Sequence, residues 1–183
     1  MALTYSNPFP LGTTAPSFSL LNTVDDKMVS LDSLKGEKGT AIFFICNHCP
    51  YVIHVKEGLV KLAHDYLAKG IAFVAISSND VVHYPQDSPD KMKEQALELA
   101  YPFPYLYDET QEVAKAYDAT CTPDFYLFDA DLKSVYHGRL DESKPQSGIA
   151  VTGKDFREAI DLMLEGKQTK EAIPSMGCNI KWK

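Results

Sequence analysis

The sequence predicts an α/β fold with a central mixed β-sheet flanked by helices, and three observations lead to this class. An apolar run at residues 41–46 passes directly into a helical pattern, and a second apolar run follows at residues 71–76. Strand, helix and strand in this order form the crossover that joins two parallel neighbours in a sheet. Two later strand-like runs, at residues 125–128 and 134–137, flank a short polar turn and predict an antiparallel hairpin.

The segment before the central strand divides into two parts. Residues 1–16 contain three prolines and are interpreted as an N-terminal arm. Residues 17–21 and 27–31 alternate loosely between apolar and polar side chains on either side of a polar turn. This pattern predicts a β-hairpin extension that precedes the core.

The first helices are predicted from the spacing of apolar residues and from residues that favour helix ends. After Pro50, apolar residues recur at three- and four-residue steps as far as Lys69-Gly70, which predicts one long amphipathic helix. Ser88-Pro89 is typical of a cap followed by a first-turn proline and predicts the start of a second helix. Thr110 is expected to cap a short third helix.

The C-terminal part of the chain contributes a final helix and a tail. Residues 152–155, Thr-Gly-Lys-Asp, resemble a capping box and introduce an amphipathic helix that ends at Gly166. The C-terminal tail, residues 168–183, has no periodicity from which an element can be predicted. Residues 77–87 are polar and predict a loop after the second buried strand.

Composition limits the classes of protein to which the chain can belong. With 183 residues, of which 45% are hydrophobic, the chain can bury one sizeable core, and residues 1–183 are expected to form a single domain. Eighteen basic and 25 acidic residues give a net charge of -7, so no basic surface for nucleic acid or anionic lipid is predicted. The first basic residue is Lys27 and no apolar run approaches a membrane span, so we expect a cytoplasmic protein.

The chemistry is concentrated at Cys46-Asn47-His48-Cys49, where the first buried strand becomes a helix. The N–H groups of a first helical turn have no partner within the helix, and the positive end of the helix dipole favours a thiolate over a thiol. Cysteines at the start of a helix, or beside a cation such as protonated His48, can have pKa values of about 3.5–7.5 instead of about 8.5. Cysteines close in sequence in a reducing compartment are typical of redox or metal sites.

These motifs resemble known families. A Cys-x-x-Cys at a strand-to-helix junction, followed by Thr122-Pro123 at the start of a later strand, resembles the thioredoxin fold. The resemblance narrows to a peroxiredoxin-like family that carries Cys-x-x-Cys and is allied to the alkyl hydroperoxide reductase and thiol-specific antioxidant (AhpC/TSA, or redoxin) proteins. The motifs that carry it are residues 46–51, Cys121-Thr122-Pro123-Asp124, Gly138-Arg139-Leu140-Asp141 and residues 177–182. It implies a thioredoxin-like fold in which Pro123 is cis and faces the dithiol.

The sequence also departs from both families. Peroxiredoxins use Pro-x-x-x-Thr-x-x-Cys and a distant arginine; if Cys49 is the peroxidatic residue, Cys46 replaces the threonine and Ile42 the proline, and no arginine precedes Arg139. Thioredoxins place tryptophan before the first cysteine, Gly-Pro between the cysteines, and a buried aspartate upstream. The corresponding residues here are Ile45, Asn47-His48 and Thr40.

Three functional hypotheses follow. In the first, a thiol–disulfide oxidoreductase, an exposed Cys46 thiolate attacks a protein or small-molecule disulfide and Cys49 resolves the mixed disulfide. Pro123 shapes the groove for the partner, His48 tunes the thiolate, and an unidentified thiol reductant restores the dithiol. In the second, a thiol peroxidase with antioxidant activity, Cys49 attacks a hydroperoxide and condenses with Cys46 or Cys121.

The third hypothesis is metal binding without turnover, with the two thiolates and His48 or His54 holding zinc or copper. The first two hypotheses need no cofactor and no resident metal. Thr122 and Asn47 are possible accessory residues, and Cys121 is either a third redox thiol or a small buried residue. Cys178 is expected to be a buried thiol that pins the tail. The sequence does not give the oligomeric state.

Overall fold

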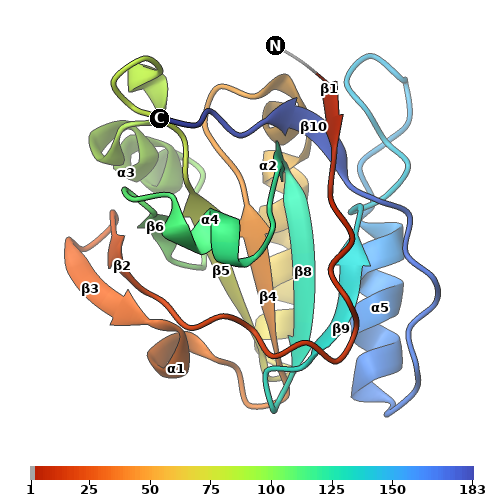
Figure 1. The fold of residues 1–183 in the computed structure, drawn as a ribbon. Coiled ribbons are helices and arrows are strands. Elements are labelled where there is room, and N and C mark those ends of the chain that lie inside the picture. Colours follow the sequence, from red (N-terminus) through yellow and green to blue (C-terminus); the bar gives the residue numbers. More distant parts are fainter. Residues whose placement is uncertain (1–2) are drawn as a thin grey trace.

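A computed structural model describes residues 3–183, and a seven-stranded mixed sheet forms its centre (Figure 1). The strands lie in the order β3 (Lys27–Ser30), β2 (Ser19–Asn22), β6 (Tyr105–Tyr107), β5 (Ile71–Ser77), β4 (Gly39–Phe44), β8 (Asp124–Asp129) and β9 (Ser134–Gly138). The β4–β5 and β5–β6 pairs are parallel, and the remaining pairs are antiparallel. The predicted central mixed sheet is therefore confirmed, and the N-terminal hairpin joins its edge through β6.

Helices cover both faces of this sheet (Figure 1). One face packs against α2 (Pro50–Leu67), α3 (Pro89–Glu98) and α5 (Lys154–Leu164), and the other against α1 (Leu31–Leu34) and α4 (Glu112–Ala116). Strand β4 is buried along its whole length, and its successive residues join the two core clusters alternately. This alternation is the strand period of two, so β4 is apolar throughout because both faces are covered. Within residues 3–183 there is no helix long and apolar enough to span a membrane.

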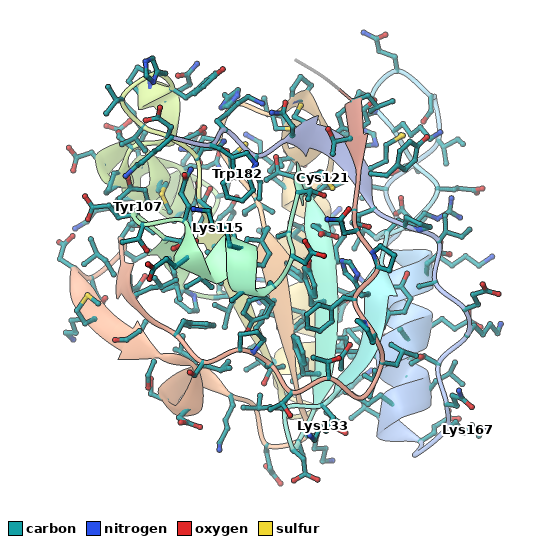
Figure 2. The ribbon with its side chains drawn as sticks, in the orientation of Figure 1. Tyr107, Lys115, Cys121, Lys133, Lys167 and Trp182 are labelled. Carbon is teal, nitrogen blue, oxygen red and sulfur yellow. The ribbon has the colours of Figure 1, made fainter. Side chains whose placement is uncertain are left out.

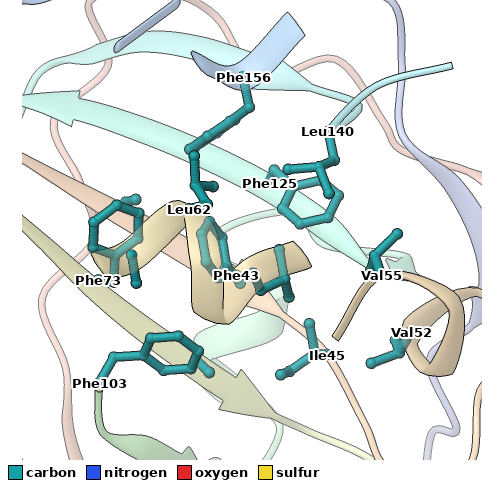
Figure 3. Close-up of a cluster of buried hydrophobic side chains, with 14 of the residues drawn as sticks. Phe43, Ile45, Val52, Val55, Leu62, Phe73, Phe103, Phe125, Leu140 and Phe156 are labelled. Atoms are coloured by element: carbon teal, nitrogen blue, oxygen red, sulfur yellow. The ribbon is translucent and has the colours of Figure 1, made fainter. Parts of the chain in front are cut away.

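Aromatic side chains fill the core between the sheet and α2 (Figure 3). The ring of Phe43 on β4 lies 5.3 Å, centroid to centroid, from that of Phe125 on β8 and 5.8 Å from that of Phe73 on β5. It also lies 5.7 Å from the ring of Phe156 on α5. These edge-on and tilted contacts lock β4, the strand that leads into the Cys-x-x-Cys, against its neighbours.

The two ends of the chain meet in a second, three-stranded sheet that the sequence did not predict. Its order is β1 (Leu3–Tyr5), β10 (Met176–Asn179) and β7 (Cys121–Thr122), and all pairs are antiparallel. The interpreted arm thus contributes a strand, as does the tail; residues 1–2 of the arm lie outside the described residues. Strands this short carry no periodicity, and partners at opposite ends of the chain leave no local signal.

The starts of α4 and α5 differ from the predicted caps, whereas α3 begins as predicted, with Ser88 as N-cap and Pro89 as its first residue. Gln111, and not Thr110, is the N-cap of α4, and its φ of 65° places it in the left-handed region. The capping box at residues 152–155 is absent, since Gly153 is the N-cap of α5 and makes no side-chain bond. The carboxylate of Asp141 instead accepts from the Gly153 N–H at 2.6 Å. Ser88 is the N-cap of α3 without a side-chain hydrogen bond.

The packing of α2 leads to a stability prediction. Leu59 on α2 is fully buried, whereas Leu97 on α3 is 63% exposed. Leu59→Ala should lower the free energy of unfolding by about 2–5 kcal/mol, because it removes buried methyl groups and leaves a cavity. The matched control Leu97→Ala should change it by less than about 0.5 kcal/mol. Urea unfolding measures both, and equal effects would contradict the packing described here.

Candidate active site

Three segments meet at one end of the central sheet. The Cys-x-x-Cys follows the carboxyl end of β4, the loop 78–87 follows the carboxyl end of β5, and Thr122-Pro123 precedes β8. Sites in open α/β sheets lie at the carboxyl ends of parallel strands, where connecting loops converge. Cys49 is the N-cap of α2 and Pro50 is its first residue, where a proline loses no helical hydrogen bond.

The two sulfurs of the Cys-x-x-Cys are enclosed. Cys46 is 1% exposed and Cys49 is fully buried, so the predicted exposed Cys46 is wrong. Cys46 Sγ lies 3.5 Å from Thr122 Oγ1, and Cys49 Sγ lies 3.2 Å from the Thr122 carbonyl oxygen. The Thr122–Pro123 peptide bond is cis, as the resemblance implies. Both sulfurs are therefore covered by the segment that carries Pro123.

The negative charge of the reduced pair lies on Cys49. The Cys46 thiol donates to Cys49, and this bond is the largest cause that lowers the Cys49 pKa, to about 5, against the opposing effect of burial. The Cys178 side chain and the N–H groups of Cys178 and Val52 also donate to it. These donors outweigh the Thr122 carbonyl, which accepts only from the protonated thiol.

Cys46 has the opposite shift. Its bond to Cys49, burial and the nearby Asp87 carboxylate raise the Cys46 pKa well above its ordinary value. This direction differs from the prediction that Cys46 holds the thiolate. The largest cause is the hydrogen bond from the Cys46 thiol to Cys49; the N–H of Val52 in the first turn of α2 adds to it, because Cys49 is the N-cap of that helix and Cys46 lies outside it.

Asp87 organises the Cys-x-x-Cys loop from the loop after β5. Its buried carboxylate accepts from the N–H groups of Asn47 at 2.8 Å and His48 at 3.3 Å. It also accepts from His48 Nδ1 at 2.6 Å and Asn79 Nδ2 at 2.8 Å. Sequence analysis placed Asp87 in a polar loop and gave it no role. The signal that could have found it is its place in the loop that follows a buried parallel strand.

His48 contacts Asp87, and one of its ring nitrogens lies within 4.8 Å of Cys46 Sγ. Because a carboxylate only accepts, Nδ1 of His48 donates to it, and the imidazole stacks on Tyr84 with ring centroids 5.3 Å apart. Within residues 3–183 the buried Nε2 atom of His48 has no hydrogen-bond partner. Asn47 fixes the same loop, since its Nδ2 donates to the Gln86 carbonyl at 2.9 Å and its Oδ1 accepts from Tyr105 at 3.1 Å.

Three side chains near the dithiol could act as ligands to a metal ion. Cys46, His48 and Asp87 each offer one ligand atom, and these atoms lie within 4.8 Å of one another. The Asp87 carboxylate already accepts four hydrogen bonds, which uses its lone pairs, and Cys46 holds a proton that a metal would have to displace. His54 bonds to Ser143 Oγ at 3.0 Å instead of turning to the sulfurs. The cluster thus falls short of the four free ligands of a structural zinc site.

The other two cysteines lie on the small sheet. Cys121 Sγ is 3.9 Å from the Pro123 carbonyl oxygen, and burial raises the pKa of the Cys121 thiol. Cys178 on β10 lies opposite Thr122 and donates to Cys49; burial and this bond raise its pKa to about 12. The sequence alone indicated no chemical role for Cys178, whose simplest interpretation was a buried thiol that pins the tail.

A cavity of about 240 Å³ lies beside this site and is lined by Tyr51, Arg139, Ser143 and Lys144, among others. A smaller adjoining cavity shares Tyr51 and Arg139 and is lined by Pro123. Nε of Arg139 donates to the Asp155 carboxylate at 2.6 Å, so this guanidinium is engaged away from the sulfurs. The two cavities form a groove that leads from Pro123 towards Arg139.

A buried dithiol at a strand-to-helix junction against a cis proline is the arrangement of a thioredoxin-fold protein, and solved structures agree with this fold. The thioredoxin domain of a thiol-disulfide oxidoreductase from Bacteroides vulgatus matches with a TM-score of 0.61 and 18% identity, over 75% of this chain and 91% of that chain. At this identity the likeness shows the fold alone. The predicted thioredoxin-like fold is thereby confirmed.

The chain belongs to the AhpC/TSA family, whose sequence pattern matches residues 11–137. An uncharacterized conserved protein from Geobacillus kaustophilus is 59% identical, with a TM-score of 0.98 over 100% of this chain and 97% of that chain. A hypothetical protein from Sinorhizobium meliloti 1021 is 42% identical, with a TM-score of 0.95 over 98% of both chains. No curated protein matches the chain.

The Asp87 contacts predict the effect of removing its charge. Asp87→Asn should lower the Cys46 pKa, because the carboxylate that disfavours a neighbouring thiolate becomes neutral. The pH profile of Cys46 alkylation, resolved by peptide mass, measures this shift. Asp80→Asn is the matched control, because Asp80 lies in the same loop and bonds to His83. An unchanged profile in Asp87→Asn, or equal shifts in both variants, would contradict the role given to Asp87.

The negative charge on Cys49 predicts how the rate of its alkylation depends on pH. A thiolate exists above its pKa, so alkylation of Cys49 by a small reagent should be at its plateau at neutral pH and decline only as the pH falls through about 5. An ordinary thiol would decline through about 8.5. Cys46→Ala should move the Cys49 midpoint upward, because the strongest donor to the thiolate is lost. A midpoint unaffected by this substitution would contradict the shared proton.

Proposed function

We propose that this protein is a thiol–disulfide oxidoreductase whose redox couple is the Cys46–Cys49 dithiol and its disulfide. The observation that carries the proposal is the hydrogen bond from the Cys46 thiol to an anionic Cys49, beside the cis Pro123 segment. Cys46 and Cys49 are separated by two residues, and both sulfurs lie against Thr122. A pair that already holds one negative charge needs no external base to begin exchange.

In the first step Cys46 attacks one sulfur of a partner disulfide. A bond forms between Cys46 Sγ and that sulfur, the partner's S–S bond breaks, and its other sulfur leaves as a thiolate. The Cys46 proton passes to Cys49, to which it is already hydrogen-bonded. We assign this step to Cys46 because Cys49, besides being buried, is held by the Thr122 carbonyl and by hydrogen bonds from Cys178 and from Val52 in the first turn of α2.

In the second step Cys49 resolves the mixed disulfide. Cys49 gives its proton to the partner thiolate that left in the first step and then attacks Cys46 Sγ. The internal disulfide forms, and the partner's second sulfur is released as a thiolate. The partner, a protein or small-molecule disulfide, gains two electrons, and a thiol reductant restores the dithiol by the reverse steps. Pro123 and the groove towards Arg139 would receive the partner, and Asp87 would position His48 and the loop.

A thiol peroxidase is the second candidate, because the anionic sulfur belongs to Cys49, the peroxidatic position by resemblance. The Cys49 thiolate would attack one peroxide oxygen, become a sulfenic acid as the O–O bond breaks, and condense with Cys46 with loss of water. The engagement of Arg139 with Asp155 weighs against this reading, since a cation beside the peroxide would stabilise the departing oxygen.

Trapping with a protein disulfide tests the proposal. Cys49→Ser incubated with insulin should accumulate a mixed disulfide at Cys46, because the resolving thiol is missing. Cys46→Ser should accumulate no insulin adduct at Cys49, because the Thr122 carbonyl and Cys178 hold that sulfur away from a protein disulfide, although a small reagent can still react with it. Mass spectrometry after acid quenching locates the adduct.

The reverse pattern of adducts would overturn the assignment of Cys46 as attacking thiol. The peroxidase reading is tested with stoichiometric hydrogen peroxide. Slow thiol loss compared with exchange supports the oxidoreductase. Fast loss through a Cys49 sulfenic acid that persists in Cys46→Ser would make the protein a peroxidase.

A further inference from the structure

The small sheet brings a third sulfur to the dithiol. In the register of β7 and β10, Cys178 is directly opposite Thr122. Residues opposite one another in an antiparallel pair project from the same face, with Cβ atoms about 4.5–5.5 Å apart. The Thr122 hydroxyl is 3.5 Å from Cys46 Sγ, so that face is the one turned towards the dithiol. Cys178 accordingly shares a buried cluster with Cys46 and Cys49 and donates to Cys49.

The backbone of β10 lies unusually close to the Thr122-Pro123 segment. A Cβ atom built on Gly177 would lie 1.9 Å from the Thr122 carbonyl oxygen and 3.1 Å from Pro123 Cδ. Only glycine fits this approach, because any side chain would collide with backbone. The contact fixes the next residue, Cys178, beside the same carbonyl group that Cys49 Sγ approaches at 3.2 Å.

Cys121 provides a contrast within the same sheet. It neighbours Thr122 on β7, and successive strand residues project to opposite faces. Its sulfur lies near the Pro123 carbonyl, and Cys121 is absent from the cluster that holds the other three cysteines. Figure 2 shows Cys121 at the end of the molecule where β10 lies, with Lys133 and Lys167 at the other end. Cys121 is therefore near the dithiol but turned away from it.

We propose that Cys178 is a third redox-active thiol, which exchanges with the Cys46–Cys49 disulfide to form a Cys49–Cys178 disulfide. This inference rests on the proposed function. The Cys178 sulfur attacks Cys49 Sγ, the bond between Cys46 and Cys49 breaks, and Cys46 leaves as a thiolate that takes up the Cys178 proton. One disulfide replaces another, so no further oxidant is needed.

The exchange changes what the oxidised protein can do. It returns Cys46, the attacking thiol, to its reduced state while Cys49 stays oxidised. It also ties β10 covalently to the start of α2, across the segment that holds Pro123. An oxidised protein with a reduced Cys46 can form a mixed disulfide that Cys49 cannot resolve, so the partner would be held until a reductant arrives.

Disulfide mapping in Cys46→Ser tests the inference. The reduced variant is treated with stoichiometric 2-hydroxyethyl disulfide at mildly alkaline pH, quenched with acid and alkylated before digestion. Cys49 first forms a mixed disulfide, and Cys178 then displaces mercaptoethanol, so we expect a Cys49–Cys178 bond. Cys46→Ser with Cys178→Ser should retain the mercaptoethanol adduct instead. Cys46→Ser with Cys121→Ser, the matched control, should still form the Cys49–Cys178 bond.

Wild-type protein provides a measurement that needs no variant to fold. After partial oxidation by the same reagent, both the Cys46–Cys49 and the Cys49–Cys178 disulfides should be found. A Cys46–Cys49 disulfide in the wild type with no Cys49–Cys178 bond in either protein would overturn the role of Cys178 and leave the proposed function intact. Absence of the Cys46–Cys49 disulfide from oxidised wild-type protein would overturn the proposed function itself. A Cys49–Cys121 bond in Cys46→Ser would also overturn the inference.

Discussion

The site depends on one shared proton between two enclosed sulfurs. Cys46 and Cys49 are separated by two residues, yet only Cys49 is the N-cap of α2, so Cys49 receives the N–H of Val52 in the first turn and Cys46 does not. Cys46 remains on the loop with a carboxylate nearby. Because burial makes a second negative charge costly, the two groups titrate as one unit with an asymmetric charge. Because of this asymmetry, Cys49 carries the negative charge, and Cys46 must lose a proton before it can act as a nucleophile.

The carboxylate near the dithiol, that of Asp87, comes from a different position in the chain than the buried aspartate of thioredoxins. Thr40 stands where thioredoxins have a buried aspartate, whereas Asp87 comes from the loop after β5 and bonds to the backbone between the cysteines. A fully buried carboxylate is stable only when its hydrogen bonds are satisfied, and four donors surround this one. The same group both fixes the loop and raises the pKa of Cys46, so geometry and charge are coupled there.

Segments near both ends of the chain, β1 and β10, form part of the structure around the site. Strand β10 lies between β1 and β7, and its glycine contact with Thr122 holds it against the cis Pro123 segment. This arrangement encloses Cys49 and adds donors to its thiolate. It also explains why the dithiol is less exposed than its place at a helix start implies. Under the proposed function, a partner disulfide has to displace covering groups before it reaches Cys46.

The order β2, β3, β4, α2, β5, α3, α4, β8, β9 and α5, and the position of the Cys-x-x-Cys between β4 and α2, were determined by the sequence alone, whereas β1, α1, β6, β7 and β10 were not. Both follow from local properties: apolar periodicity, helix breakers such as Lys69-Gly70, and two cysteines at fixed spacing. The caps of α4 and α5 were mispredicted because a left-handed residue or a distant carboxylate replaced the local side chain. The charge on Cys49, the role of Asp87 and the approach of Cys178 were decided only by the tertiary structure. Each arises from contacts between segments far apart in the chain, and hydrogen bonds and Coulomb interactions at those contacts leave no local pattern in the sequence.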